Sequence, residues 1–307
     1  MKRLKYFVYF FKNAWFVLPY KLFRKKKSCE RFLGQKNITT NYSDEVLLEY
    51  IKSNKPFMAV RYGAVELSCI NNYEKIRLGL KKKYKDIVKF SMKNNAGFFP
   101  PTDEYLTKYS KLMNEVMKDT DILGISGIHM EDYFYKLQCK QSKIIQYFSF
   151  EPINKKWLLG LNGKKVLVIS PFKEEIEEQL KKKEHLSDLK SIDAKFEVIK
   201  AIQSIGDEVP DVPTWFDALE YMKSEIDKID FDIALVGAGA YGTPLCAYIK
   251  SLNKQAIQTG GATSLLFGII GSRWENRDYV KKQINEYWIR PFDKPKGYEK
   301  IEKGCYW

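Results

Sequence analysis

Apolar and polar positions divide most of the chain into two alternating kinds of segment. Short apolar runs, rich in β-branched and aromatic residues, predict buried strands at 57–62, 121–126, 164–170, 196–201, 231–236 and 254–259. Segments with apolar residues at helical spacing lie between them, at 44–53, 65–78, 103–118, 173–184, 214–228 and 243–252. Because strands and helices alternate, we predict an α/β domain with a Rossmann-like, doubly wound and mainly parallel sheet.

Two hydroxyl side chains stand where predicted helices begin. Ser43 precedes the helix expected from Asp44, and Thr214 precedes the helix expected from Trp215. A serine or threonine at this position accepts a hydrogen bond from one of the free backbone N–H groups of the first turn. We therefore predict N-caps at both residues.

The first 27 residues combine aromatic and basic side chains. They hold nine basic residues and no acidic ones, in a chain whose net charge is +14. One apolar face at helical spacing consists of Leu4, Phe7, Val8, Phe11, Ala14, Trp15 and Leu18, and Lys5 and Lys12 share another face. This pattern predicts a basic amphipathic helix and is typical of helices that lie on an anionic membrane surface.

Two other interpretations of the N-terminal segment stay open, a short inserted anchor and an ordinary basic helix that packs on the protein. The apolar stretch from Tyr6 to Tyr20 is interrupted by Lys12 and is shorter than the ~20 residues that a membrane span requires. We expect residues 1–40 to be a membrane-associating segment, with contact through 1–27. The protein would then be cytoplasmic and peripheral on the inner face of the bacterial membrane. Because the positive charge is terminal, we predict no nucleic-acid partner.

Cysteine and histidine usage limits the chemistry that the chain can perform. Five cysteines are scattered without a C-x-x-C pair, which fits reduced thiols in a cytoplasmic protein. The chain has two histidines, His129 and His185. Two histidines are too few for a histidine-rich metal site and offer few candidates for the histidine of a Ser-His-acid triad.

A glycine-rich turn follows the strand predicted at 231–236. Gly237, Gly239 and Gly242 hold its first, third and sixth places, and a helix-like segment follows. Such glycines let the backbone turn sharply and approach a diphosphate. The amides from Gly239 through Tyr241 to Gly242 can then hold the anion at a helix N-terminus. A glycine turn that only packs tightly is the alternative.

The glycine turn does not look like an NAD site. A dinucleotide site requires an acidic residue about 20 residues after the first glycine, to hold the ribose hydroxyls. Residues 257–261 offer no acid. We therefore expect a nucleotide diphosphate or a similar anion at this turn, and no NAD.

The other predicted strand ends also carry residues suited to a ligand. They are Arg61, Gly63 and Glu66 after the first strand, Ser170 at the end of the third, and Gly260 and Gly261 after the sixth. Because ligands bind beyond the carboxyl ends of parallel strands, we expect these residues to share one rim. Arg61 can hold a phosphate through two N–H groups, and glycine turns add backbone amides. The set favours a phosphate-bearing substrate.

Two acidic residues are candidates for catalysis. Glu66 is the first, and Asp103, which follows the loop at 97–101, is the second. A carboxylate at the rim can take the proton of an acceptor hydroxyl or help to hold a metal ion. Asp103 can equally be an acid favoured by the dipole at a helix N-terminus, and Arg61 can be part of a structural ion pair.

The C-terminal tail from Arg273 to Trp307 is rich in aromatic and charged residues. Aromatic rings can form the wall of a sugar site. Packing of the tail across the body of the protein is the alternative interpretation.

At Arg61 to Glu66, together with the glycine turn and the segment 260–263, the chain resembles bacterial glycosyltransferases of the GT-D type. In that class the first strand ends in an R-x-G-D-x-E-like turn, whose two acids help to bind the metal and the diphosphate of the donor. Arg61, Gly63 and Glu66 match, and Ala64 stands at the aspartate position. The resemblance implies Mn²⁺ or Mg²⁺ near Glu66, which Ala64 puts in doubt because one carboxylate anchors a divalent cation poorly.

Residues 164–307 are similar to polysaccharide-biosynthesis proteins that carry this domain, in the phrases VLVISPF, FDIALVGAGAYGTPL, GGATSLLFGI and NEYWIRP. We expect a GT-D-like domain at 41–307, with a possible internal junction near residue 162. The resemblance implies transfer of a sugar from a nucleotide-sugar donor to a glycan or lipid-linked acceptor, in cell-surface glycan assembly. A non-catalytic nucleotide-sugar-binding or scaffold protein, and an NAD-dependent sugar-modifying enzyme, stay open as alternatives.

Overall fold

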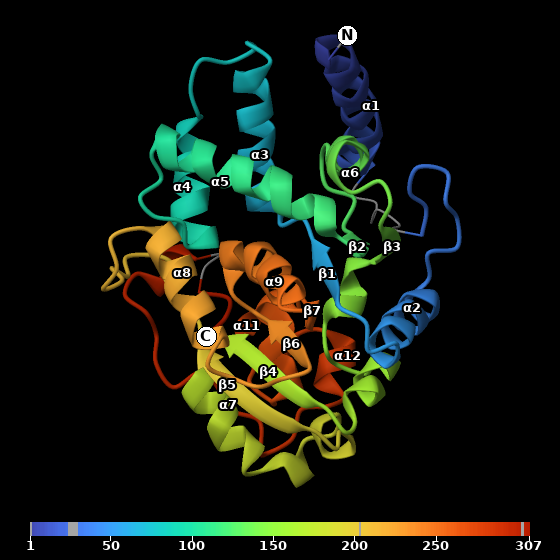
Figure 1. Ribbon diagram of the computed structural model, residues 1–307, viewed down its shortest axis with the longest axis vertical. Coiled ribbons are helices and arrows are strands. Elements are labelled where there is room, and N and C mark those ends of the chain that lie inside the picture. The colour runs from blue at the N-terminus through green and yellow to red at the C-terminus, as the bar shows by residue number, and fades with distance from the viewer. Residues whose placement is uncertain (1, 24–29, 203, 302–303) are drawn as a thin grey trace.

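The computed structural model describes residues 2–23, 30–202, 204–301 and 304–307, with side chains at 2–14 and from residue 30 onward. Their centre is a single sheet of parallel strands with helices on both faces (Figure 1). The strands are β1 (Phe57–Arg61), β2 (Ile122–Ile125), β3 (Lys143–Gln146), β4 (Lys165–Ser170), β5 (Lys195–Lys200), β6 (Ile233–Val236) and β7 (Gln255–Ile257). Their order is β3-β2-β1-β7-β6-β4-β5. The prediction of a parallel, Rossmann-like α/β fold is confirmed.

The helices cover the sheet much as the sequence predicts. Six match predicted segments: α2 (Thr40–Lys52), α3 (Ala64–Arg77), α5 (Asp103–Val116), α7 (Lys173–Leu180), α8 (Trp215–Ile226) and α9 (Gly242–Ser251). Five helices were not predicted from the sequence: α4 (Asp86–Ala96), α6 (Glu131–Gln138) and the short helices α10 (Thr263–Leu266), α11 (Ser272–Glu275) and α12 (Asp278–Lys281). Strand β3, which has four residues and lies at the edge of the sheet, was not predicted either.

Each strand contributes to two hydrophobic cores because successive side chains point to opposite faces of a sheet. In β4, Leu167 and Ile169 belong to the core that includes residues of α3, α5, α8 and α9. Val166 and Val168 belong to the other core, with residues of α2 and α7. Burial on both faces explains why these strands read as continuous apolar runs.

The predicted helix starts are right at one residue and wrong at the other. Thr214 caps α8, since its side chain accepts a hydrogen bond from the backbone N–H of Asp217. Ser43 is not an N-cap, because α2 begins at Thr40 and its cap is Thr39, which accepts from the N–H of Tyr42. The Ser43 hydroxyl instead donates to the carbonyl of Thr39 at 2.7 Å.

The N-terminal segment forms helix α1 (Lys2–Phe23), as predicted. Side chains of α1 form hydrogen bonds with residues of α3, of α6 and of the loop before α6. Tyr6 Oη donates to Asn71 Oδ1 at 2.7 Å, Asn13 Nδ2 donates to Asp132 Oδ1 at 2.7 Å, and Met130 N donates to Asn13 Oδ1 at 3.0 Å. Tyr6 is buried, so α1 is docked over at least its first half.

The face of α1 that the sequence analysis identified as apolar is turned away from the body. Leu4 is 71% exposed, Phe7 38%, Val8 58% and Phe11 66%, and Ala14 is exposed as well. The side chains of Trp15 and Leu18, which the prediction placed on the same face, lie outside the described set. Among the helices of the described residues, none has the length and apolar character needed to cross a membrane.

Residues near 162 join the two halves of one sheet. They follow the 3₁₀ turn Lys156–Leu161 and lead into β4. Strand β7 pairs with β1 from the first half and with β6 from the second half. Hydrogen bonding of the sheet is therefore continuous across the proposed junction.

Candidate functional site

A cavity of about 270 Å³ lies beyond the carboxyl ends of the strands. Nine of the predicted site residues line it: Arg61, Gly63, Glu66, Ser170, Gly237, Gly239, Tyr241, Gly260 and Gly261. Gly242 and Asp103 are not among its lining residues. The structure therefore brings the ends of four strands together around one hollow, as the strand-end argument predicts.

The strand order makes this edge a suitable place for a ligand. The chain leaves β4 toward the edge strand β5, whereas it leaves the neighbouring strand β6 in the opposite direction, toward β7. The two connections diverge, which opens a crevice at the strand ends and defines a topological switch point. Ser170 and Gly237, at the ends of these two strands, line the cavity.

Two glycine turns, residues 237–242 after β6 and residues 260–261 after β7, are in close contact. A Cβ atom on Gly237 would lie 2.4 Å from Thr263 Oγ1 and 2.7 Å from the carbonyl oxygen of Gly260, which is closer than real Cβ atoms come. Gly239 and Gly260 have φ values of +52° and +60°, in the left-handed region that favours glycine. These glycines are required by geometry, and the turns they form shape one wall of the cavity.

Gly242 has a structural role next to the cavity. It is the first residue of α9, and a Cβ there would lie 2.7 Å from Gln258 Nε2. Gln258 in turn accepts hydrogen bonds from Arg61 N at 3.0 Å and Thr243 Oγ1 at 3.2 Å. This glutamine ties the end of β1 to the start of α9, and the sequence analysis missed it.

Arg61 extends along the boundary of the cavity. Its Nη2 atom lies 3.0 Å from where a Cβ on Gly260 would be, and its Cζ lies 5.6 Å from the centre of the Tyr147 ring. A guanidinium beside a glycine turn can donate to a phosphate whose other oxygens accept from backbone amides. Arg61 thus lies beside the Gly260 turn, and its contact with a phosphate stays a prediction.

Glu66 folds back onto the start of its own helix. It is the third residue of α3, and its Oε2 atom lies 1.9 Å from where a Cβ on Gly63 would be. Negative charge at a helix N-terminus is stabilised by the helix dipole. Gly63 therefore leaves the space in which the Glu66 carboxylate reaches the edge of the cavity, and this explains the glycine in the R-x-G-x-x-E spacing.

Gly63→Ala is expected to displace the Glu66 carboxylate while leaving the fold intact. The φ of Gly63 is −73°, which alanine adopts without strain, and the atom that must move is the end of a flexible side chain. Any activity that depends on Glu66 should fall to the level of Glu66→Ala, and the double variant should lose nothing more. Rates of the three variants test this, with melting temperatures as the control for folding. Additive losses would contradict the coupling.

Asp103 lies outside the cavity, and the structure supports its alternative role. It occupies the first turn of α5, after the N-cap Thr102. Its carboxylate pairs with Lys89 and accepts from Tyr84 N at 3.2 Å. The hydrogen bond from Lys89 is the main reason that the pKa of Asp103 is lowered. An acid at a helix start looks the same in sequence whether it is structural or catalytic.

Tyr241 forms part of the cavity wall through its ring. The ring is buried and stacks on Trp215 with centroids 4.7 Å apart, and its hydroxyl lies 3.2 Å from Ser204 Oγ. Burial raises the pKa of Tyr241 well above its usual value. Trp215 and Ser204 thus hold the ring in place, and a ligand contact at Tyr241 stays a prediction.

The C-terminal tail closes over the glycine turns. Tyr306 and Trp307 line the cavity, and the Tyr306 ring lies 2.5 Å from where a Cβ on Gly261 would be. The structure shows features of both interpretations, since Tyr306 and Trp307 line the cavity while Trp274 and Val280 of the tail pack in a hydrophobic cluster. Contact of the tail with a sugar stays a prediction. Asn95 also lines the cavity, and its buried Oδ1 has no hydrogen-bond partner in the part of the chain that the structure describes.

The described residues do not form a metal site of their own. They contain no group of three or more His, Cys, Asp or Glu side chains placed to hold an ion. Glu66 is the one carboxylate among the described lining residues, and Mg²⁺ and Mn²⁺ need several oxygen ligands. The donor set of the described residues does not fit a protein-only metal centre.

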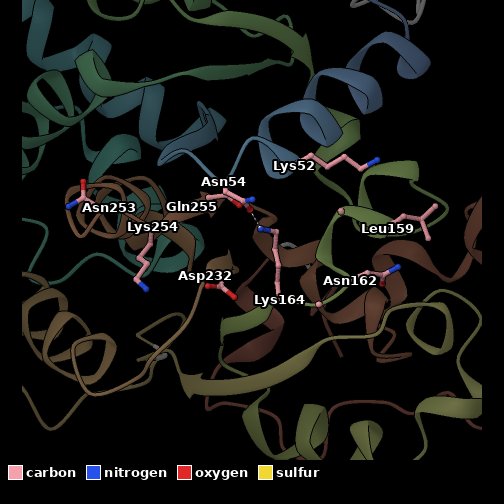
Figure 2. Close-up of a pocket in the computed structure, with 11 residues that line it drawn as sticks. Lys52, Asn54, Leu159, Asn162, Lys164, Asp232, Asn253, Lys254 and Gln255 are labelled. Carbon is pink, nitrogen blue, oxygen red and sulfur yellow. Dashed lines mark hydrogen bonds between the residues drawn. The ribbon is translucent and has the colours of Figure 1, made fainter.

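A wider hollow of about 540 Å³ opens at the opposite edge of the sheet (Figure 2). Its polar groups largely serve the fold. Lys164 Nζ donates to Asn54 Oδ1 at 2.6 Å, and the Asp232 carboxylate accepts from Lys165 N at 2.8 Å. This hollow lies at the amino ends of the strands. We place the functional site at the carboxyl ends, where the glycine turns and Arg61 meet.

The all-parallel sheet, with glycine turns and an arginine at its carboxyl edge, defines a Rossmann-like α/β protein. Within that class, residues 44–266 match the family model described as a GT-D fold-like domain. The match covers more than half of the chain, so the chain belongs to the GT-D-like family. This confirms the resemblance seen at Arg61 to Glu66.

Solved structures of low sequence identity are similar to this chain. One concerns domain of unknown function 1792, described as having a distinct glycosyltransferase fold, with 14% identity, a TM-score of 0.43, and coverage of 74% of this chain and 83% of that one. Another is a glycosyltransferase (DUF1792) from Streptococcus sanguinis, with 14% identity, a TM-score of 0.45, and coverage of 86% and 96%. No curated protein matches the chain.

Proposed function

We propose that the protein is a glycosyltransferase that takes a sugar from a nucleotide-sugar donor and transfers it to a glycan or lipid-linked acceptor. The observation that carries this proposal is the convergence of Arg61, Glu66 and two glycine turns around one cavity at the carboxyl edge of the sheet. The cavity combines anion-binding groups with aromatic walls from Tyr241 and Tyr306. Membership of the GT-D-like family supports the same proposal.

The proposed chemistry assigns each group a separate role. The acceptor hydroxyl attacks the anomeric carbon of the donor sugar, a new glycosidic bond forms, and the bond to the diphosphate breaks. The electron pair leaves with the diphosphate, where Arg61 and the backbone amides of the glycine turns stabilise the developing charge. The Glu66 carboxylate receives the proton of the acceptor hydroxyl.

Glu66→Gln is expected to lower the rate of nucleoside diphosphate release about 100-fold, because a general base contributes a factor of this order. Release from UDP-glucose, GDP-mannose and dTDP-glucose, with and without manganese, measures the effect. Asp103→Asn is the matched control, since Asp103 lies outside the cavity, and it should retain most of the rate. Equal loss in both variants, or none in Glu66→Gln, would remove Glu66 from the reaction.

One observation favours a second candidate, a non-catalytic nucleotide-sugar-binding protein. The position of the Glu66 carboxylate over Gly63, in the first turn of α3, is also the position of a structural helix cap. A protein that binds donor sugars but releases no nucleoside diphosphate from any of them would fit this candidate.

We also propose that the protein acts at an anionic membrane surface, which helix α1 contacts. At helical spacing, Arg3 and Lys5 flank the exposed apolar face of α1 on its two sides. Arg3 lies beside Gly79, since its Nη2 atom is 2.7 Å from where a Cβ on that glycine would be. The loop that follows Gly79 contains four exposed lysines: Lys81, Lys82, Lys83 and Lys85.

Helix α1 and the loop between α3 and α4, which carries these lysines, lie at the same end of the molecule (Figure 1). Apolar side chains can enter the headgroup region while the lysines attract anionic lipids. The charged side chains named on this surface are all basic, and its apolar side chains all lie on one face of α1. This combination favours an anionic membrane over a protein partner.

Replacing Phe7 and Phe11 together by serine is expected to weaken binding to phosphatidylglycerol-containing vesicles about 100-fold, from the apolar area withheld from the bilayer. Vesicle co-sedimentation measures this. Phe292→Ser is the control, because Phe292 is 56% exposed but belongs to the C-terminal segment. Unchanged sedimentation of the double variant would contradict the role of α1.

A further inference from the structure

A second, smaller cavity adjoins the proposed donor cavity. Its volume is about 70 Å³, against about 270 Å³ for the donor cavity. Four residues line both hollows: Arg61, Gly261, Arg273 and Tyr306. The two cavities therefore share a wall, and that wall includes the arginine proposed to hold the leaving diphosphate.

The small cavity is lined by aromatic rings. Phe148 and Tyr279 are 41% and 37% exposed. Tyr279 is held in place, since its hydroxyl donates to Glu151 Oε2 at 2.7 Å. Partly exposed rings at the edge of a small hollow are surfaces on which a sugar ring can stack.

The same cavity is rich in positive charge. Arg61, Arg273 and Arg277 line it, whereas Glu151 is the one acid among its described lining residues and is bound by Tyr279. Arg277 and Tyr279 line the same small hollow, and the charge of Arg277 opposes the rise that burial causes in the pKa of Tyr279. Arg273 is positioned by its hydrogen bond to Tyr306 Oη at 2.9 Å.

We infer that this cavity binds the acceptor, and that the acceptor's reacting sugar carries or adjoins a negatively charged group, a carboxylate or a phosphate. The inference rests on the proposed glycosyltransferase function. The ring would stack on Phe148 and Tyr279, and its anionic group would meet Arg277. The shared wall then brings an acceptor hydroxyl next to the donor sugar, because Arg61 contacts both hollows.

The size and position of the cavity favour an acceptor over the donor nucleoside. The small hollow is about a quarter of the volume of the donor cavity. The donor cavity already offers apolar and amide groups that do not line the small hollow, namely Ile202, Ile205 and Asn95. A nucleoside therefore has a larger place to occupy there.

Saturation-transfer difference NMR with the full chain tests the inference without requiring turnover. The probes are methyl glucuronide, glucose 6-phosphate and neutral methyl glucoside. We expect one or both anionic probes to bind at least about tenfold more tightly than methyl glucoside, as one charge-assisted hydrogen bond provides. The better of the two anionic probes identifies the charged group as carboxylate or phosphate.

Two exposed lining residues provide the variants. Arg277→Gln should remove the preference for the anionic probes, and Phe148→Ser should weaken all three. Arg31→Gln, at an exposed arginine that does not line the cavity, is the control and should change nothing. The thermal shift produced by UDP or GDP should be the same in wild type and Arg277→Gln.

The outcomes separate this inference from the proposed function. Equal binding of the neutral and anionic probes, or no effect of Arg277→Gln, would overturn the anionic acceptor. Displacement of the anionic probes by UMP would assign the cavity to the nucleoside and would also overturn it. Failure of every nucleotide sugar to react, together with specific binding of an anionic probe, would reject the transferase and leave an anionic-sugar site.

Discussion

Arg61→Ala is expected to lower the catalytic efficiency for release of nucleoside diphosphate from the donor about 100-fold or more. The reason is that the guanidinium lies beside the Gly260 turn, where charge develops as the diphosphate departs, and loss of one such donor costs a factor of 10²–10³. Arg61→Lys should recover only part of the rate, because an ammonium cannot form the paired N–H contacts of a guanidinium. Steady-state kinetics with the preferred donor measure both changes.

The control for this prediction is Arg290→Ala. Arg290 is an exposed arginine paired with Glu275, and it lines neither cavity at the carboxyl edge. Its removal should leave the kinetics unchanged. If Arg61→Ala and Arg290→Ala behave alike, Arg61 has no special part in the reaction.

Gly237→Ala is expected to abolish donor binding and to destabilise the fold by about 1–3 kcal/mol, the range for an overpacked site. The added Cβ would meet the Gly260 carbonyl at 2.7 Å, and this backbone atom cannot rotate away. The two glycine turns would have to move apart, and their backbone amides would no longer be positioned to bind the diphosphate. Isothermal titration with the donor and thermal unfolding measure the two effects.

A glycine outside the site separates loss of binding from loss of stability. Gly163 has a φ of +75° and no atom within 4 Å of an added Cβ. Gly163→Ala therefore strains the backbone by roughly 1 kcal/mol without touching the cavity. It should be less stable yet bind the donor normally. Normal donor binding by Gly237→Ala would show that the contact between the turns does not shape the site.

The central strands could be predicted because both of their faces are buried, so they read as apolar runs. Helix α4 was harder, since its buried positions Val88 and Met92 are interleaved with the exposed Ile87 and Phe90, and this blurs the helical period. Strand β3 is too short to stand out against its polar flanks.

The rim of the site could be predicted because parallel strands must all end at the same edge. What the sequence does not show is which distant segments reach that edge. Gln258 joins two strand ends, Asn95 arrives from α4, and Tyr306 arrives from the tail. Asp103, the second catalytic candidate, lies in the first turn of α5 and does not line the cavity; from sequence, its structural and catalytic roles could not be separated, because a carboxylate in the first turn of a helix suits both.

The most direct measurement is a thermal-shift screen of the full chain against UDP-, GDP-, CMP- and dTDP-sugars and NAD, each with and without manganese. A ligand that binds the folded state raises the melting temperature by mass action. We predict that one class of nucleotide sugar raises it, that NAD does not, and that Arg61→Ala abolishes the shift. No shift with any nucleotide sugar, or a shift that survives in Arg61→Ala, would contradict the donor site proposed at the carboxyl edge of the sheet.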